Sequence, residues 1–196
     1  MIRTERLLLR RWRETDHAPF AQLNADSAVM EYLQGTLSRE RSNAFIDRIE
    51  AAWDQRGWGL WAVEVPGVAP FIGFVGLASA DFVSGPPMVE VGWRLAREQW
   101  GHGYATEAAR EALRFGFEDV ALGEIVSFTV PHNERSRRVM ERIGLVRDPS
   151  GDFDHPGVDA VAYPRIVHQV LYRLDRDTWQ TAHRAGEPSP GGEPRR

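Results

Sequence analysis

Residues 89–107 read VEVGWRLAREQWGHGYATE, and this stretch decides the fold because a strand pattern passes through a glycine loop into a helix pattern. Apolar side chains alternate here with Glu90, Gly92 and Arg94. This alternation predicts a strand over 88–95, with those three residues on the face opposite the apolar one. Glu90 is therefore expected to stand apart from its apolar neighbours.

The glycine loop follows this strand directly. Gly101 and Gly103 permit a tight turn, and the helix predicted from Tyr104 presents its first free N–H groups at the positive end of its dipole. Such a corner suits phosphate, although glycines there also serve as plain turn residues. A dinucleotide loop would need a third glycine where Thr106 stands, and the Gly-Lys-Ser/Thr ending of a nucleoside triphosphate loop is absent. Both of those loops fit poorly.

Outward from this stretch, strand and helix patterns alternate, which places the chain in the mixed α/β class. The predicted strands cover 6–12, 58–65, 71–79, 124–130 and 165–174, the second and third forming a hairpin. The predicted helices follow a cap at Thr15 or Asp16, run from Ser38 to before Gly57, begin near Tyr104, and run from Asn133 to a stop at Gly144.

Composition predicts one domain over residues 1–183 and a disordered tail over 184–196. The chain has 196 residues, of which 42% are hydrophobic, enough for one core. The tail holds proline, glycine and charge with nothing to bury. A net charge of −4 makes nucleic acid an unexpected partner. The lack of cysteine excludes disulfides and an acyl-cysteine intermediate. No apolar run approaches the roughly 18 residues that span a bilayer, so we expect no membrane association and a cytoplasmic location.

Three separated motifs resemble the GNAT superfamily of N-acetyltransferases, in the branch that acetylates the N-terminal residue of ribosomal proteins. They are the strand and loop of 89–107, Asn133-Glu134-Arg135-Ser136, and Glu141-Arg142-Ile143-Gly144-Leu145. The resemblance implies a mostly antiparallel mixed sheet of about seven strands with a splayed parallel pair, flanked by about four helices. It also implies transfer of an acetyl group from acetyl-coenzyme A to a primary amine, on a small molecule or a protein N-terminus, without a covalent enzyme intermediate.

The resemblance implies that acetyl-coenzyme A, the acyl donor, binds to the strand over 88–95, the glycine loop and the start of the helix at Tyr104. Loop N–H groups would bind the coenzyme A pyrophosphate, and Gly92 would mark a bulge that opens a slot for pantetheine. Trp100 stands where the family has glutamine or arginine, Thr106 adds a hydroxyl, and His102 either touches phosphate or is solvated. The implied cofactor-binding residues are Trp93, Arg94, Leu95, Trp100, Gly101, His102, Gly103, Tyr104, Ala105, Thr106 and Asn133.

Two catalytic residues are implied by position. Glu90 matches a strand glutamate that accepts the amine proton in some members of the superfamily; the alternative is a solvated strand carboxylate. Ser136 matches the serine of an Asn-x-x-Ser motif that protonates the departing thiolate. Asn133 and Ser136 are equally ordinary at a helix start, where they cap it. Tyr172, on the last predicted strand, is a substitute for the acid.

The acceptor side is less defined. The resemblance places Asp154, His155 and His168 near the acceptor, and no spacing matches a metal-ligand motif, so we predict no metal. Trp53, Trp58 and Trp61 either pack in the core, which we favour, or line an acceptor entrance. A coenzyme-A-binding regulatory module without turnover and a nucleotide-binding domain are the competing functions. A homodimer stays open.

Overall fold

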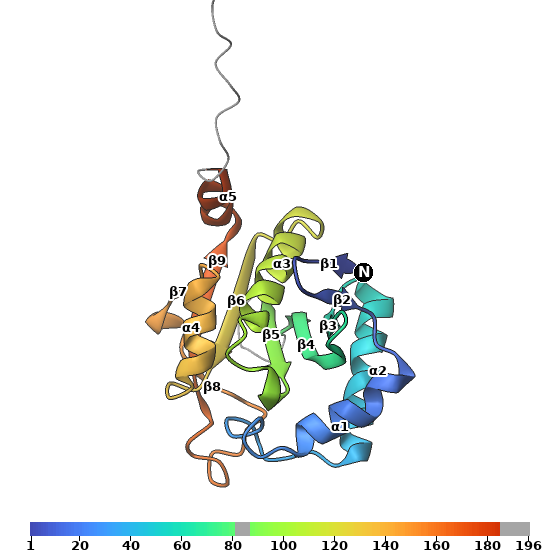
Figure 1. Cartoon of the computed structure of the whole chain (residues 1–196). Coiled ribbons are helices and arrows are strands. Elements are labelled where there is room, and N and C mark those ends of the chain that lie inside the picture. Colours follow the sequence, from blue (N-terminus) through green and yellow to red (C-terminus); the bar gives the residue numbers. More distant parts are fainter. Residues whose placement is uncertain (81–86, 185–196) are drawn as a thin grey trace, which may run out of the picture.

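The computed structural model describes residues 1–80 and 87–184, and a nine-stranded sheet organises them (Figure 1). Along the sheet the strands lie in the order β1-β2-β3-β4-β5-β6-β9-β7, with β8 paired to β9. The strands are β1 (Ile2–Arg3), β2 (Leu8–Arg10), β3 (Leu60–Val65), β4 (Ala69–Ser79), β5 (Val89–Leu95), β6 (Glu124–Thr129), β7 (Val146–Arg147), β8 (Phe153–Asp154) and β9 (His168–Asp175).

Helices cover both faces of the sheet (Figure 1). They are α1 (His17–Ala25), α2 (Arg39–Arg56), α3 (Tyr104–Glu118), α4 (Glu134–Arg142) and α5 (Arg176–Arg184). Alternate residues of β3 divide between two buried clusters, because successive strand side chains point to opposite faces. Trp61 and Val63 pack in the cluster that includes α3, whereas Leu60 and Ala62 pack in the cluster that includes α1 and α2. The strand β3 therefore contributes to both cores.

The parallel pair of β5 and β6 interrupts an otherwise antiparallel sheet. The two strands share a single register position, Glu90 opposite Val126, and do not pair beyond it. The ladder between β4 and β5 runs without a shift from Gly73 opposite Leu95 to Ser79 opposite Val89, so the bulge expected at Gly92 is absent. The two strands diverge instead because β5 stays paired with β4 along its length, while β6 stays paired with β9. A gap opens in the sheet where the two strands diverge.

The mixed sheet with its splayed parallel pair confirms the predicted fold class, with more elements than expected. The short strands β7 and β8 and the helix α5 were not predicted, and β9 begins at His168 because residues 163–167 turn through hydrogen bonds to the carbonyl of Tyr163. Trp179 anchors α5 by packing on Phe117, with 5.4 Å between ring centroids. Arg184 ends this helix, and the rest of the predicted tail lies outside the described residues.

Trp53, Trp58 and Trp61 pack in or against the core. Trp61 is fully buried and meets Trp53 and Phe115 edge to face, at 5.4 and 5.1 Å between centroids. Trp58 packs against the same cluster. None of the three lines the cavity described below, which agrees with the favoured core interpretation.

Candidate active site

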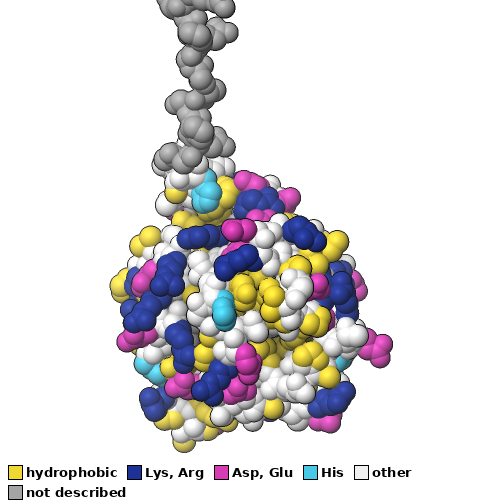
Figure 2. Space-filling model, viewed as in Figure 1, with side chains coloured by type: hydrophobic (Ala, Val, Ile, Leu, Met, Phe, Trp, Pro, Cys, Tyr) yellow, Lys and Arg dark blue, Asp and Glu magenta, His cyan; other side chains and the backbone are white. Residues whose placement is uncertain are grey.

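A cavity of about 730 Å³ occupies the gap between β5 and β6. Its walls come from β5, the glycine loop, the start of α3, β6, α4, the α1–α2 connection and the segment before β9. This volume lies within the range of small-molecule sites. Outside the cavity, Figure 2 shows basic and acidic side chains interspersed over the visible face, with a hydrophobic area near its middle. A ligand that enters here meets both exposed strand backbone and a helix N-terminus.

The glycine loop adopts the left-handed backbone that its sequence suggests. Gly101 and Gly103 have φ of +81° and +82°, a region that strains residues with a Cβ. Gly103 caps α3 without a side chain, so the first N–H groups of this 15-residue helix are presented to the cavity. Arg6 holds the loop from outside, donating to the His102 carbonyl at 3.0 Å and pairing with Glu107 at 2.6 Å. The loop therefore has the backbone geometry that an anion site at a helix N-terminus requires.

Trp100, which stands where the family has glutamine or arginine, has a structural function in this chain. Its indole Nε1 donates to the Leu95 carbonyl at 2.9 Å, which joins the end of β5 to the loop. The guanidinium of Arg135, on α4, lies 4.2 Å above the indole ring. Arg138 and Arg142 also line the cavity. Sequence reasoning missed these cations, although their spacing of three and four residues marks one helix face.

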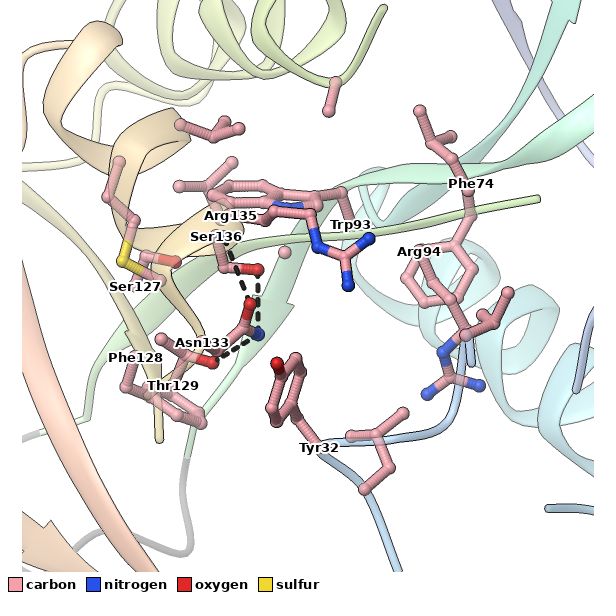
Figure 3. A pocket seen from close by; sticks show the side chains of 18 of the residues that line it. Tyr32, Phe74, Trp93, Arg94, Ser127, Phe128, Thr129, Asn133, Arg135 and Ser136 are labelled. Atoms are coloured by element: carbon pink, nitrogen blue, oxygen red, sulfur yellow. Dashed lines mark hydrogen bonds between the residues drawn. The ribbon is translucent and has the colours of Figure 1, made fainter. Parts of the chain in front are cut away.

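Asn133 and Ser136 are both a helix cap and part of the cavity wall. The Asn133 Oδ1 accepts from the Ser136 backbone N–H at 3.2 Å, which is an N-cap bond. Its Nδ2 donates to the Thr129 hydroxyl at 2.9 Å and to the Ser136 hydroxyl at 3.1 Å (Figure 3). Because the Ser136 oxygen accepts this bond, its own proton is left to donate. Capping and cavity chemistry therefore coexist in the same residues.

Glu90 lines the cavity and is half-buried. Burial raises its pKa to about 7, because the charged form loses hydration. A carboxylate with such a pKa exchanges protons near neutral pH.

Arg94 shares this face of β5. Its guanidinium carbon lies 5.6 and 5.4 Å from the ring centres of Phe45 and Phe74. Its Nη1 donates to the Asn24 Oδ1 at 2.6 Å. Burial lowers its pKa to about 10, so it remains a cation at neutral pH. The predicted donor strand therefore also presents a charged side chain to the cavity.

Of the remaining predicted residues, some line the cavity and some face away from it. His155 lines it, and burial lowers its pKa. Asp154 and His168 are not in the cavity wall; they pair with each other at 3.0 Å in the exposed β8–β9 ladder. His102 also lies outside the wall, stacked on the Tyr104 ring at 5.4 Å between centroids. Adjacent strand residues point to opposite sides, which separates Asp154 from His155.

The other predicted donor residues line the cavity. They are Trp93, Arg94, Leu95, Trp100, Gly101, Gly103, Tyr104, Ala105, Thr106 and Asn133. Tyr172 does not line it: this residue is buried, accepts from Arg137 at 3.0 Å and donates to Glu141 at 3.2 Å. Its hydroxyl is occupied away from the cavity, which contradicts its use as a substitute acid.

The α1–α2 connection forms a wall that the sequence gave no reason to expect. Tyr32 points toward Asn133 in Figure 3, and its ring lies 5.3 Å from that of His132. Gln34 donates to the Gly157 carbonyl at 3.0 Å, which joins this connection to the segment before β9. These contacts link residues 100 and 123 positions apart, so no local sequence pattern predicts them.

Within residues 1–80 and 87–184, no group of three or more histidine and acidic side chains could hold a metal ion. In the same ranges, no helix combines the length and the apolar character that crossing a bilayer requires.

Comparison with known proteins identifies the family. The model of the acetyltransferase (GNAT) domain matches residues 6–146. The Bacillus subtilis protein YkkB is 33% identical over 148 residues, which cover 72% of this chain and 83% of YkkB. An acetyltransferase of the GNAT family from Bacillus anthracis superposes with a TM-score of 0.73 at 26% identity, over 90% of this chain and 98% of that one.

The fold also matches RimL, a ribosomal L7/L12 alpha-N-protein acetyltransferase solved with coenzyme A. The TM-score is 0.69 at 14% identity, over 89% of this chain and 97% of RimL. At this identity the match shows a shared fold. The chain therefore belongs to the GNAT family, and it is an acetyl-coenzyme-A-dependent acyltransferase.

Proposed function

We propose that this protein transfers an acetyl group from acetyl-coenzyme A to a primary amine in a ternary complex, without a covalent enzyme intermediate. The observation that carries the proposal is the gap between β5 and β6, which has a left-handed glycine loop at one end and the Asn133–Ser136 pair on its wall. We call the glycine loop, the start of α3, the free edge of β5 and the start of α4 the donor end. The side chains of β5, of the α1–α2 connection and of the segment before β9 form the acceptor end.

The donor end fits the coenzyme through its backbone. The N–H groups that follow Gly103 would bind the pyrophosphate, and the unpaired edge of β5 from Trp93 to Leu95 would pair with the pantetheine amides. Arg135 would add a cation for the phosphates, in place of the polar side chain that the family carries at Trp100. The thioester supplies an activated acyl group. The absence of cysteine supports direct transfer to the amine.

Glu90 and Ser136 would move the protons. Glu90 takes one proton from the incoming ammonium, directly or through water, so that a neutral nitrogen attacks the thioester carbonyl. The nitrogen–carbon bond forms and the carbon–sulfur bond breaks. The Ser136 hydroxyl, held by Asn133, donates to the departing thiolate, which leaves as coenzyme A thiol. As the intermediate collapses, the nitrogen loses a second proton to water and keeps the third as the amide N–H. The proton held by Glu90 returns to Ser136 through water, so both residues are restored and one proton is released overall.

The test is release of free thiol from acetyl-coenzyme A over a panel of amines, with mass spectrometry of the acetylated product. We expect turnover for at least one amine and none without an amine. Tight coenzyme A binding by calorimetry without turnover for any amine would instead favour the regulatory module. Preference for ATP or NAD over acetyl-coenzyme A would favour the nucleotide-binding domain.

A further inference from the structure

The acceptor end contains a half-buried arginine, Arg94, without a carboxylate partner among the described residues. Among the described residues, no Asp or Glu oxygen lies within 4 Å of the Arg94 guanidinium, and Asn24 supplies its one hydrogen bond. Arg10, which is buried, pairs with two carboxylates, those of Asp16 at 2.7 Å and Glu64 at 2.9 Å. Arg94 is only half-buried, and the wall of the cavity removes part of its hydration without supplying an opposite charge. Its guanidinium is therefore available to an anionic group of a ligand.

The free edge of Arg94 has a shape that selects its ligand. Asn24 occupies Nη1, so Nε and Nη2 have no partner among the described residues. These two nitrogens share the side-on edge of the guanidinium, whose parallel N–H groups match the two oxygens of a carboxylate. Figure 3 shows Arg94 on the side of the cavity away from Asn133 and Ser136. A carboxylate bound there would not occupy the donor end.

The surroundings of Arg94 describe the rest of the ligand. The Phe45 and Phe74 rings contact its guanidinium, and Leu33, Val158 and Ile166 line the same cavity. Glu90 lies four residues away on the same strand face, a separation of about 13 Å between Cα atoms. A ligand that places its amine near Glu90 and its anionic group at Arg94 needs an apolar body between these two groups.

We infer that Arg94 binds a carboxylate of the acceptor, so that the acceptor is a small amine that carries a carboxylate on an apolar body. This inference rests on the proposed function, because it identifies the substrate class of the same site. Arg94 would act as a specificity residue: it selects the acceptor and takes no part in proton transfer.

The experiment compares matched amines that differ only in the anionic group. 4-(Aminomethyl)benzoate is tested against 4-(aminomethyl)benzamide, and the series from glycine to 6-aminohexanoate against the corresponding amides. Thiol release gives kcat/KM for each. We expect the benzoate to exceed its amide by about 10- to 100-fold, as for a hydrogen-bonded charge pair, and activity to rise along the series as the two groups separate.

Variants test whether Arg94 carries the preference. In Arg94→Met the ratio of carboxylate to amide kcat/KM should fall toward one, and Arg94→Lys should retain only part of it because the fork is lost. Asn24→Asp leaves Arg94 in place and gives it an internal carboxylate, so the ratio should fall there too. Arg138→Met removes another cavity arginine, from the donor end, and should leave the ratio unchanged. Thermal unfolding and coenzyme A affinity confirm that each variant is folded.

Binding separates failure of the inference from failure of the proposed function. Calorimetry with coenzyme A present measures 4-(aminomethyl)benzoate against its amide independently of turnover. Acetylation of both at equal kcat/KM, or equal ratios in wild type and Arg94→Met, would overturn the inference and leave the transferase in place. Selective binding of the benzoate without turnover of any amine would support Arg94 as the carboxylate site and contradict the proposed function. Equal binding without turnover would overturn both.

Discussion

The donor and acceptor ends of the cavity are built from different materials. The donor end is mostly backbone: a left-handed loop, helix N–H groups and an unpaired strand edge that lie within residues 93–106. The acceptor end is mostly side chains, which come from β5, the α1–α2 connection and the segment before β9. A backbone site tolerates changes of side chain, whereas a side-chain site changes its ligand with each substitution. The same architecture can therefore keep one donor and vary its acceptor.

The largest expected effect is the loss of Glu90, the one carboxylate among the described residues that line the cavity. Glu90→Gln should lower kcat/KM by about 100-fold or more at pH 7, the usual worth of a general base. Wild-type activity should rise with pH through about 7, because only ionised Glu90 accepts a proton. The variant should lose that limb of the profile. Glu5→Gln, at an exposed position, is the control; an unchanged pH profile in Glu90→Gln would remove Glu90 from the mechanism.

A smaller loss is expected at the boundary between the two ends. Ser136→Ala should lower kcat by roughly 10- to 100-fold with little change in the KM for acetyl-coenzyme A, since only the proton for the thiolate is lost. The helix cap survives this change because Asn133 bonds the backbone N–H of residue 136. Steady-state kinetics and unfolding curves measure the two effects separately. A large rise in KM at constant kcat would place Ser136 in cofactor binding instead.

The donor end should respond to backbone strain. Gly103→Ala places a Cβ at φ +82°, which costs about 1–2 kcal/mol, and should raise the KM for acetyl-coenzyme A about tenfold. Gly67, with φ +77° in the β3–β4 turn, is a matched control outside the cavity. Gly67→Ala should lower stability without changing that KM. Equal KM values in the two variants would show that the loop backbone is not the cofactor cradle.

The smallest expected effect is on stability, and it has a definite sign. Burial holds the pKa of Glu90 at about 7, above the ordinary value of 4.5, so its contribution to stability is full below 4.5 and is lost as pH rises to 7. Because glutamine does not ionise, Glu90→Gln removes this pH-dependent loss of stability. The variant should therefore melt a few degrees above wild type at pH 8, with a smaller difference at pH 5. Calorimetry at both pH values checks it; a variant that melts lower at pH 8 contradicts the burial of an unpaired carboxylate.

Sequence reasoning succeeded where the signal was local. The alternation over Val89–Leu95, the two glycines and the cap at Asn133 each act through neighbours in the chain, and each gave the expected element. Sequence reasoning wrongly predicted a bulge at Gly92. The divergence of β5 and β6 depends on their other neighbours in the sheet, β4 and β9, which no local pattern reveals. Sequence reasoning also failed for α5, whose few apolar residues form a helix because Trp179 finds Phe117 to pack on.

The sequence by itself determined the donor end, because left-handed glycines, a helix start and an Asn cap are properties of short segments. Only the tertiary structure decided the acceptor end. It brought Asn24 and Phe45 to Arg94 and left that guanidinium without a carboxylate, and it turned His155 inward while Asp154 paired with His168 outside. Burial and pairing depend on contacts between distant segments, and those contacts exist only after the sheet has brought the segments together.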